Sequence, residues 1–242
     1  MSRLFEELDY RPTPLGPLTL RRRHVLALGV DVFEIKLGDE HLMSSLFIES
    51  EIALADLGLA ARPGSDLDVV VGGLGLGYTA RAVLNSARVG SLLVVDALDA
   101  VIEWHETGLL PLGDDLVADP RCRFLHGDFF TLAASSDGFD PDRPARRFDA
   151  ILVDIDHSPR AHLAEGNADF YQPDALHRLT GHLKPGGIFG LWSDEPPDPD
   201  FTDRLAGVFA AARAEPVTFH NPLQDRPFTQ TVYLAETAEV VE

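Results

Sequence analysis

Short apolar runs alternate with amphipathic stretches along the chain from residue 67 onward. Runs rich in Val, Leu and Ile indicate buried strands, and apolar residues spaced three or four apart indicate helices. We expect strands at residues 67–72, 91–96, 122–126, 148–154, 186–192, 216–220 and 230–235. We expect helices between them at residues 76–88, 99–110, 170–182 and 199–213. Such alternation predicts a parallel sheet with helices on both faces.

The last two expected strands follow each other without a helix, so one of them enters the sheet antiparallel. The predicted fold class is therefore α/β, with a doubly wound, mostly parallel, seven-stranded Rossmann-like sheet. Ahead of this sheet, residues 24–36 predict a hairpin around Gly29, and residues 45–59 predict a helix. We expect residues 1–62 to form an N-terminal extension of hairpin plus helix and residues 63–242 to form the α/β domain.

Two loops are expected to be long. Residues 135–147 contain Pro and Arg and predict an exposed loop, and residues 156–169 follow a strand directly. Ligands of doubly wound sheets bind at the carboxyl ends of strands, where such loops lie. The second loop is therefore placed to border a binding site.

Composition and charge exclude several classes of partner. The chain has 242 residues, of which 45% are hydrophobic and 24% charged, and its net charge is −19. Such a field repels nucleic acid and favours small cations such as amines, so we expect no nucleic-acid partner. Cys122 is the single cysteine, and the histidines lack the spacing of a zinc-binding helix, so no metal site is expected. The chain lacks a long apolar segment and a secretion-type N-terminus, so we expect a cytoplasmic protein without a membrane partner.

A glycine-rich turn follows the first expected core strand. The sequence Val69-Val-Val-Gly-Gly-Leu-Gly-Leu-Gly77 lets the backbone turn tightly and approach a ligand through Gly73, Gly75 and Gly77. A dinucleotide fingerprint needs a small residue at position 78, where this chain has Tyr78, so the pattern disfavours NAD. It suits a nucleoside of the adenosylmethionine type.

Two acids lie at the ends of the next strands. Asp96 lies where a carboxylate can bond both ribose hydroxyls, and Asp128 lies where adenine would be met. Their neighbours Ala97 and Phe129 complete the expected nucleoside contacts. The alternative reading is that both acids only cap helices.

A third acid, Asp154, ends the fourth core strand beside the expected position of a sulfonium, and it is expected to contact the cofactor as well as the acceptor. A carboxylate there can orient an amine or remove its proton. We expect Asp154 to act as base or amine anchor, supported by Asp156 and His157. The sequence Ser193-Asp-Glu195 beyond the next strand adds acidic residues to the same mouth.

Together these motifs resemble the class I methyltransferase fold and, within it, the spermidine synthase (polyamine aminopropyltransferase) branch. The resemblance runs from about Gly38 to Trp192. Its segments are Val69–Gly77, Asp96–Glu103, Gly127-Asp128, Phe148–Asp154, Phe170-Tyr171 and Leu183–Ile188. The resemblance implies S-adenosylmethionine or its decarboxylated form as co-substrate, and aminopropyl transfer to a small amine. Dimers are common among such enzymes, which makes a homodimer a candidate assembly.

The chain departs from that branch at four places. The acid that holds the aminopropyl amine is replaced by Leu76, and the Gln after the N-terminal Asp-Gly has no counterpart. The Tyr-His pair aligns with Glu49-Ser50, and the Asp-x-x-Asp segment ends in His157. Two alternatives therefore stay open: a methyltransferase acting on a small molecule, and a non-catalytic nucleoside-binding protein. A dehydrogenase is a more distant fourth.

Overall fold

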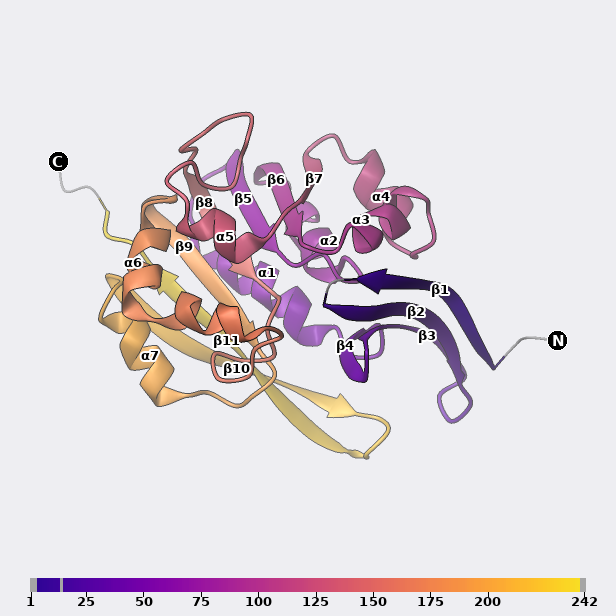
Figure 1. Cartoon of the computed structure of the whole chain (residues 1–242). Coiled ribbons are helices and arrows are strands. Elements are labelled where there is room, and N and C mark those ends of the chain that lie inside the picture. The colour runs from indigo at the N-terminus through magenta and orange to yellow at the C-terminus, as the bar shows by residue number, and fades with distance from the viewer. Residues whose placement is uncertain (1–3, 14, 240–242) are drawn as a thin grey trace.

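The computed structural model describes residues 4–13 and 15–239 and contains two sheets (Figure 1). The smaller sheet is antiparallel, and its strand order is β1-β2-β3-β4. Its strands are β1 Phe5–Thr13, β2 Gly16–Val25, β3 Val30–Leu37 and β4 Glu40–Ser44. The predicted hairpin around Gly29 is confirmed as β2 and β3, which pair from Leu18 with Leu37 to Val25 with Val30.

The larger sheet has seven strands in the order β10-β11-β9-β8-β5-β6-β7. They are β5 Leu67–Gly72, β6 Val89–Asp96, β7 Cys122–His126, β8 Phe148–Val153, β9 Leu183–Ser193, β10 Ala211–Asn221 and β11 Arg226–Glu236. The first five strands of the chain in this sheet pair in parallel. Strand β11 pairs antiparallel with both β9 and β10, as the missing helix before it predicted. The predicted α/β fold class is confirmed.

Helices cover both faces of this sheet (Figure 1). They are α1 Glu49–Ala61, α2 Tyr78–Leu84, α3 Asp99–Glu106, α4 Gly113–Ala118, α5 Phe129–Ala134, the 3-10 helix η1 Glu165–Tyr171, α6 Pro173–Thr180 and α7 Pro199–Ala206. Within the described residues, no helix is both long and apolar enough to cross a bilayer.

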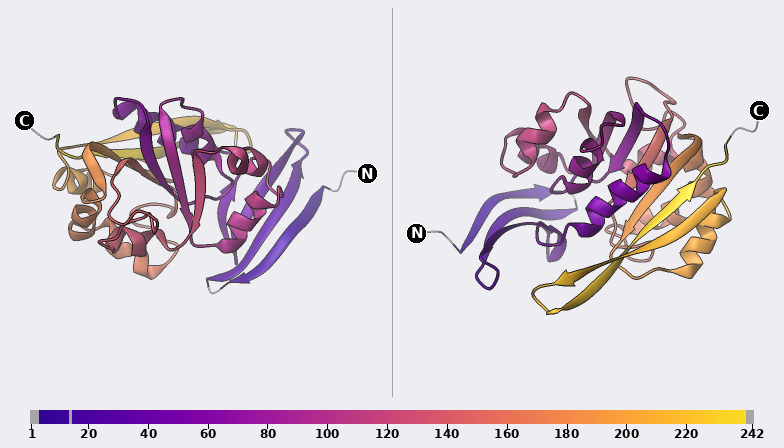
Figure 2. Two further views of the ribbon diagram at one scale, coloured as in Figure 1. Left: turned by 90° about the horizontal axis from the view of Figure 1, so that it is seen from above. Right: turned by 180° about the vertical axis from the view of Figure 1, so that it is seen from behind.

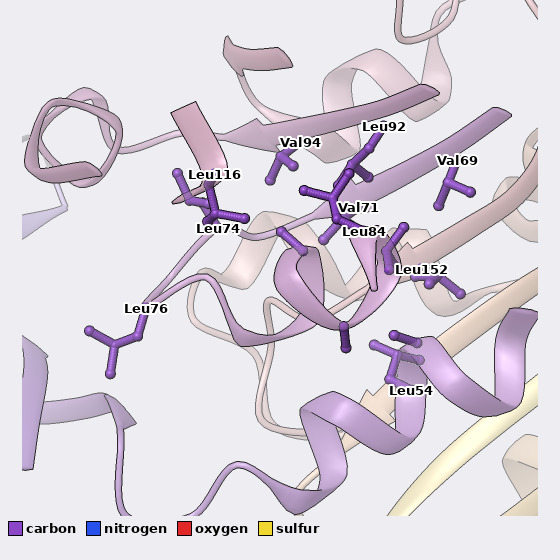
Figure 3. Packing of buried hydrophobic residues seen from close by; sticks show 14 of the residues in the cluster. Leu54, Val69, Val71, Leu74, Leu76, Leu84, Leu92, Val94, Leu116 and Leu152 are labelled. Carbon is purple, nitrogen blue, oxygen red and sulfur yellow. The ribbon is translucent and has the colours of Figure 1, made fainter. Parts of the chain in front are cut away.

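Alternation along the strands divides the core into two layers. On one face, Val69 and Val71 of β5 pack with Leu54 of α1 and with α2, α3 and α4 (Figure 3). On the other face, Val70 packs with Phe129 of α5 and with α6 and α7. Because successive side chains of a strand point to opposite faces, an uninterrupted Val run serves both layers.

Three sequence expectations need correction. The helix expected over residues 199–213 ends at Ala206, and β10 begins at Ala211 in what appeared to be a continuing helical pattern. The loop at 135–147 is not wholly exposed, because Phe139 is fully buried in the second layer and Asp140 is paired with Arg123 and Arg146. Strands β1 and β4 were not expected from the sequence.

The two sheets lie side by side and are joined through α3. The indole Nε1 of Trp104 donates a hydrogen bond to Asp9 of β1 over 2.7 Å, and Arg11 pairs with Glu103 over 3.1 Å. Strands β10 and β11 form a long hairpin whose turn projects beyond the sheet (Figure 2). A cavity opens between the parallel strand ends, the smaller sheet and this hairpin turn.

Candidate active site

A cavity of about 640 Å³ lies at the carboxyl ends of β5, β6 and β8. Strand ends, the N-terminal sheet, the start of α1 and the β10–β11 hairpin all contribute to its lining. Of the residues expected from the sequence, it brings together Gly73, Gly75, Asp96, Ala97, Asp128, Phe129, Asp154 and His157. Gly77 and Asp156 do not line it.

The glycine turn allows close packing of two strand ends. Gly73 has φ +93°, and a Cβ atom built on it would lie 2.0 Å from the carbonyl oxygen of Asp154. The Gly73 N–H donates to Val95 O, and the Asp154 N–H donates to Gly72 O, both over 2.8 Å. No side chain fits at Gly73 without separating β5 from β8.

Gly77 packs on the side of the glycine turn that faces away from the cavity. Its φ is +89°, and a Cβ there would lie 2.7 Å from Leu116 and 2.9 Å from the His105 ring, away from the cavity. His105 is fully buried, and its Nε2 lies 3.0 Å from the carbonyl oxygen of Gly75. Since that oxygen can only accept, Nε2 carries the proton, and burial lowers the pKa of His105. A neutral histidine thus holds the turn.

Asp96 faces the cavity from the end of β6. Its two oxygens accept the N–H groups of Leu74 and Leu98, each over 2.8 Å. Burial raises the pKa of Asp96 and outweighs the opposing effect of these amides. Each carboxylate oxygen keeps a second lone pair. Asp96 therefore fixes the glycine turn and can still accept hydroxyl groups from a ligand, with exposed Ala97 beside it.

Asp128 is the N-cap of α5, because its Oδ1 accepts the Thr131 N–H over 2.8 Å. The capping role considered from the sequence is thus present, and Asp128 lines the cavity as well. Phe129 forms the adjoining wall and packs under Gly72, where an added Cβ would lie 2.5 Å from its ring. Asp128 therefore offers one free oxygen above an aromatic surface.

Asp154 directly follows β8 and lines the cavity next to Gly73 of the glycine turn. The hydroxyl of Thr79 in α2 donates to Asp154 Oδ2 over 2.8 Å. Burial raises the pKa of Asp154 to about 6, and the Thr79 hydrogen bond opposes part of that rise. A carboxyl group with such a pKa can exchange a proton near neutral pH.

Glu51 is a site residue that was not predicted. It lies in the first turn of α1, is only 6% exposed and lines the cavity. Burial, and next the charge of Asp154, raise its pKa to about 8. One sequence feature could have identified it: Glu51 shares the buried face of α1 with Leu54, Ala55 and Leu59. An acid on an apolar helix face is a candidate functional group.

Asp156 has a structural position. It is 1% exposed, and its carboxylate accepts hydrogen bonds from the Leu163 N–H over 2.7 Å, Asn167 Nδ2 over 2.9 Å and the Tyr171 hydroxyl over 2.8 Å. These bonds close the loop after β8 onto η1. With all these donors engaged, Asp156 shapes the loop and does not reach the cavity.

His157, in contrast, lines the cavity. Its Nε2 lies 3.2 Å from Glu40 Oε1 in β4, so it joins the loop after β8 to the smaller sheet. Asp194, the middle residue of the acidic segment after β9, also lines the cavity. Its N–H donates to the carbonyl oxygen of His157 over 2.7 Å. The cavity therefore has an acidic lining of Asp154, Asp194 and Glu51, of which Asp154 and Asp194 were expected from the sequence.

A hydrogen-bonded chain of side chains closes the cavity beside Glu51. Ser50 Oγ accepts from the indole Nε1 of Trp192 over 2.8 Å and lies 2.6 Å from Gln230 Oε1 and 2.8 Å from Glu51 Oε2. Gln230 Nε2 donates to Asp194 Oδ1 over 2.8 Å. This chain joins α1 to β9 and β11 and fixes the orientation of the Trp192 ring.

Leu76 points away from the cavity. It is 2% exposed and packs in the first core layer, on the side of the glycine turn that faces the smaller sheet (Figure 3). Its backbone N–H lies 3.1 Å from the sulfur of Met43. The glycine turn therefore presents no carboxylate to a ligand.

A search of solved structures gives similar proteins over almost the whole chain. A spermidine synthase in complex with the transition-state analogue AdoDATO matches with a TM-score of 0.74 and 16% identity over 97% of this chain and 74% of that chain. The spermidine synthase from Thermotoga maritima matches with a TM-score of 0.72, the same identity and the same coverage. No protein-family model matches the sequence, and no curated protein matches it either. The chain therefore has the spermidine synthase-like class I methyltransferase fold.

Proposed function

We propose that the chain is a spermidine synthase-like transferase that uses an S-adenosylmethionine-type sulfonium nucleoside to alkylate a small amine, with aminopropyl as the transferred group. One observation supports this most: two sets of groups with different chemistry line one cavity. Gly73, Asp96 and Asp128 suit a nucleoside, while Asp154 and Glu51 suit an amine. A spermidine synthase with a similar fold has been solved in complex with the transition-state analogue AdoDATO, and this supports a ligand of the same type here.

The residues present fit such a co-substrate. The close backbone approach at Gly73 leaves room where a side chain would intrude, and Asp96 keeps lone pairs for a ribose diol. Asp128 and Phe129 would hold the adenine. When bound, the sulfonium supplies an electrophilic carbon with a good leaving group.

The remaining steps fall to the carboxyl groups. The amine arrives as an ammonium ion and must lose a proton before its lone pair can attack. Asp154, between the nucleoside and acceptor ends, orients the nitrogen and accepts that proton together with Glu51. The new N–C bond forms as the C–S bond breaks, and the electron pair of that bond stays on sulfur as a neutral thioether. Alignment of the two reactants supplies much of the acceleration.

A methyltransferase acting on a small molecule is the second candidate, and Leu76 favours it. The glycine turn lacks an acid for the amine of a decarboxylated co-substrate, because Leu76 is buried in the core. Under this alternative the intact co-substrate donates its methyl group at the same Asp154.

Calorimetric titration with S-adenosylmethionine, its decarboxylated form and methylthioadenosine tests the proposal. We expect binding of the decarboxylated form, followed by turnover with an amine. Preference for the intact form would favour methyl transfer, and binding without any turnover would favour a non-catalytic protein. If none of the three binds, the proposed function is wrong.

A matched pair of variants tests whether nucleoside binding depends on Asp96. Asp96→Ala should weaken nucleoside binding about 10- to 100-fold, since it removes a charged hydrogen-bond acceptor. Asp99→Ala, three residues further on and outside the cavity, should leave it unchanged. Thermal unfolding of both variants controls for the amide hydrogen bonds that Asp96 accepts within the fold.

A further inference from the structure

The two acids at the inner end of the cavity have no cationic partner. Glu51 is only 6% exposed and Asp154 is part-buried, and both line the cavity. Among the described residues, no Arg, Lys or His lies within ion-pair distance of either carboxyl group. Buried carboxyl groups are ordinarily paired or hydrogen-bonded. The described part of the fold therefore supplies no positive charge that compensates either carboxyl group.

Hydrogen bonds within the protein satisfy an ionised Glu51 only weakly. Ser50 has one hydroxyl hydrogen, and Gln230 Oε1 at 2.6 Å competes for it with the ionised Glu51 Oε2 at 2.8 Å. The Trp192 ring, fixed by its own bond to Ser50, forms the adjoining wall. Two carboxyl groups beside an indole are suited to an ammonium group, which binds both to carboxylates and to the face of an aromatic ring.

Glu51 and Asp154 together suit a ligand with one positive charge. Burial raises their pKa values to about 8 and about 6, so near neutral pH one of the two groups holds a proton and the pair carries about one negative charge. A singly charged nitrogen neutralises the pair.

Apolar side chains contribute to the cavity wall beyond Glu51. Phe47, which precedes α1, and Leu223, in the turn of the β10–β11 hairpin, both line the cavity, and Leu223 is 49% exposed. The Phe47 ring is held by Phe219 of β10, which does not itself line the cavity, with ring centroids 6.0 Å apart. The polar side chains of Gln230 and Asp194 line the cavity as well, and Gln230 Nε2 donates to Asp194 Oδ1.

We propose that the acceptor is an amine with one cationic nitrogen and an apolar body, whose nitrogen lies between Glu51 and Asp154 and whose body lies along Phe47 and Leu223. This inference rests on the proposed function and deepens it. It separates this chain from an enzyme for linear diamines, because a second ammonium group would lie against Phe and Leu side chains.

Two probes of equal length test the acceptor class. n-Pentylamine and 1,4-diaminobutane differ only in a methyl group where the diamine has its second ammonium. Each is titrated calorimetrically into protein saturated with methylthioadenosine. We expect n-pentylamine to bind at least tenfold more tightly. Equal affinity, tighter binding of the diamine, or no binding of either amine would overturn the inference while leaving the nucleoside site intact. Failure of methylthioadenosine itself to bind would instead contradict the proposed function.

Three variants locate the two ends of the amine. Glu51→Gln should weaken n-pentylamine binding at least tenfold and leave methylthioadenosine binding unchanged. Leu223→Asp should shift the preference towards the diamine, since it places an acid at the apolar end. Leu26→Asp, in the exposed turn between β2 and β3 and outside the cavity, is its matched control and should shift nothing. An unchanged preference in Leu223→Asp would overturn the assigned position of the apolar body.

Discussion

The two ends of the cavity are built in different ways. At the proposed nucleoside end the main chain holds the lining residues: Gly73 packs against the backbone of Asp154 just after β8, and Asp96 and Asp128 accept hydrogen bonds from backbone N–H groups. At the proposed acceptor end side chains fix one another, with Ser50 joining Trp192 and Gln230. The first end belongs to the parallel half of the sheet, and the second belongs to α1 and the antiparallel strands.

This difference predicts which end of the cavity tolerates substitutions. A site built from backbone geometry depends on a few glycines and on strand ends such as that of Asp154, whose positions the parallel pairing of β5 and β8 fixes. A site built from side chains depends on contacts such as that between Ser50 and Gln230, which are 180 residues apart. Substitutions at the acceptor end can therefore alter the acceptor without disturbing the nucleoside. The departures at Glu49-Ser50 and His157 lie towards that end, whereas the departure at Leu76 lies in the glycine turn.

The largest effect is expected at the backbone-built end. In Gly73→Ala the new Cβ would meet the Asp154 carbonyl oxygen at 2.0 Å, and φ +93° is a strained conformation for alanine. We expect a loss of about 3 kcal/mol or more in the free energy of unfolding and no measurable nucleoside binding. Chemical denaturation and calorimetry measure the two effects.

Two further glycines control that experiment. Gly166→Ala, in η1, adds a Cβ that meets nothing within 4 Å and should change neither quantity. Gly75→Ala meets only the flexible Met43 side chain, at 2.7 Å, and should fold with an intermediate loss. Equal effects at Gly73 and Gly166 would contradict the backbone-built description.

Substitution of Glu51 is expected to raise the free energy of unfolding, in contrast to Gly73→Ala. Its pKa is about 8 in the fold and near 4.5 when unfolded, so the folded protein holds a proton that the unfolded chain releases. Stability therefore falls as pH rises from about 4.5 to 8. Glu51→Gln removes this loss and should be about 2–4 kcal/mol more stable than the parent at pH 8, or about 5–10 °C higher in Tm. The advantage should shrink towards pH 5.

Glu49→Gln is the matched variant, since Glu49 is an exposed acid in the same helical turn. We expect its Tm to follow that of the parent at every pH. If Glu51→Gln is no more stable than the parent at pH 8, the burial of an uncompensated acid at the acceptor end is contradicted. A gain in stability with a loss of amine binding would mark Glu51 as a residue kept for function.

The same contrast explains what could be predicted from the sequence. The core strands and the strand-end residues that line the cavity follow from local patterns, because apolar runs that end at Gly73, Asp96 and Asp154 fix both the strand and its end. The apolar face of α1 marks Glu51 as a buried acid, but only the packing of α1 against β9 and β11 places it at the cavity. Asp156 lies two residues from Asp154, and only the path of the loop onto η1 shows that it is enclosed.

Secondary structure was mispredicted where one pattern suits two structures. Residues 207–213 continue the apolar spacing of α7, yet the chain turns at Gly207 and pairs with β11 from Ala211 onward. Strand β1 alternates exposed with part-buried residues and gains its register only from β2. Long-range pairing decided both cases, and a local window does not contain it.

The smallest expected effect lies at the boundary between the two ends, where Thr79 donates to Asp154. A hydrogen bond to the charged form of an acid lowers its pKa, so removing the donor raises it. Thr79→Val keeps the shape of this buried side chain and should raise the pKa of Asp154 by roughly half to one unit, equivalent to about 1 kcal/mol. Thr79→Ser keeps the hydroxyl and should restore the parent value.

Carboxyl-carbon NMR titration of both variants in a Glu51→Gln background follows the pKa of Asp154 without the influence of Glu51. A pKa that does not respond to Thr79→Val would mean that burial alone sets the proton affinity of Asp154, and that α2, which begins right after the glycine turn, has no part in tuning the acceptor end.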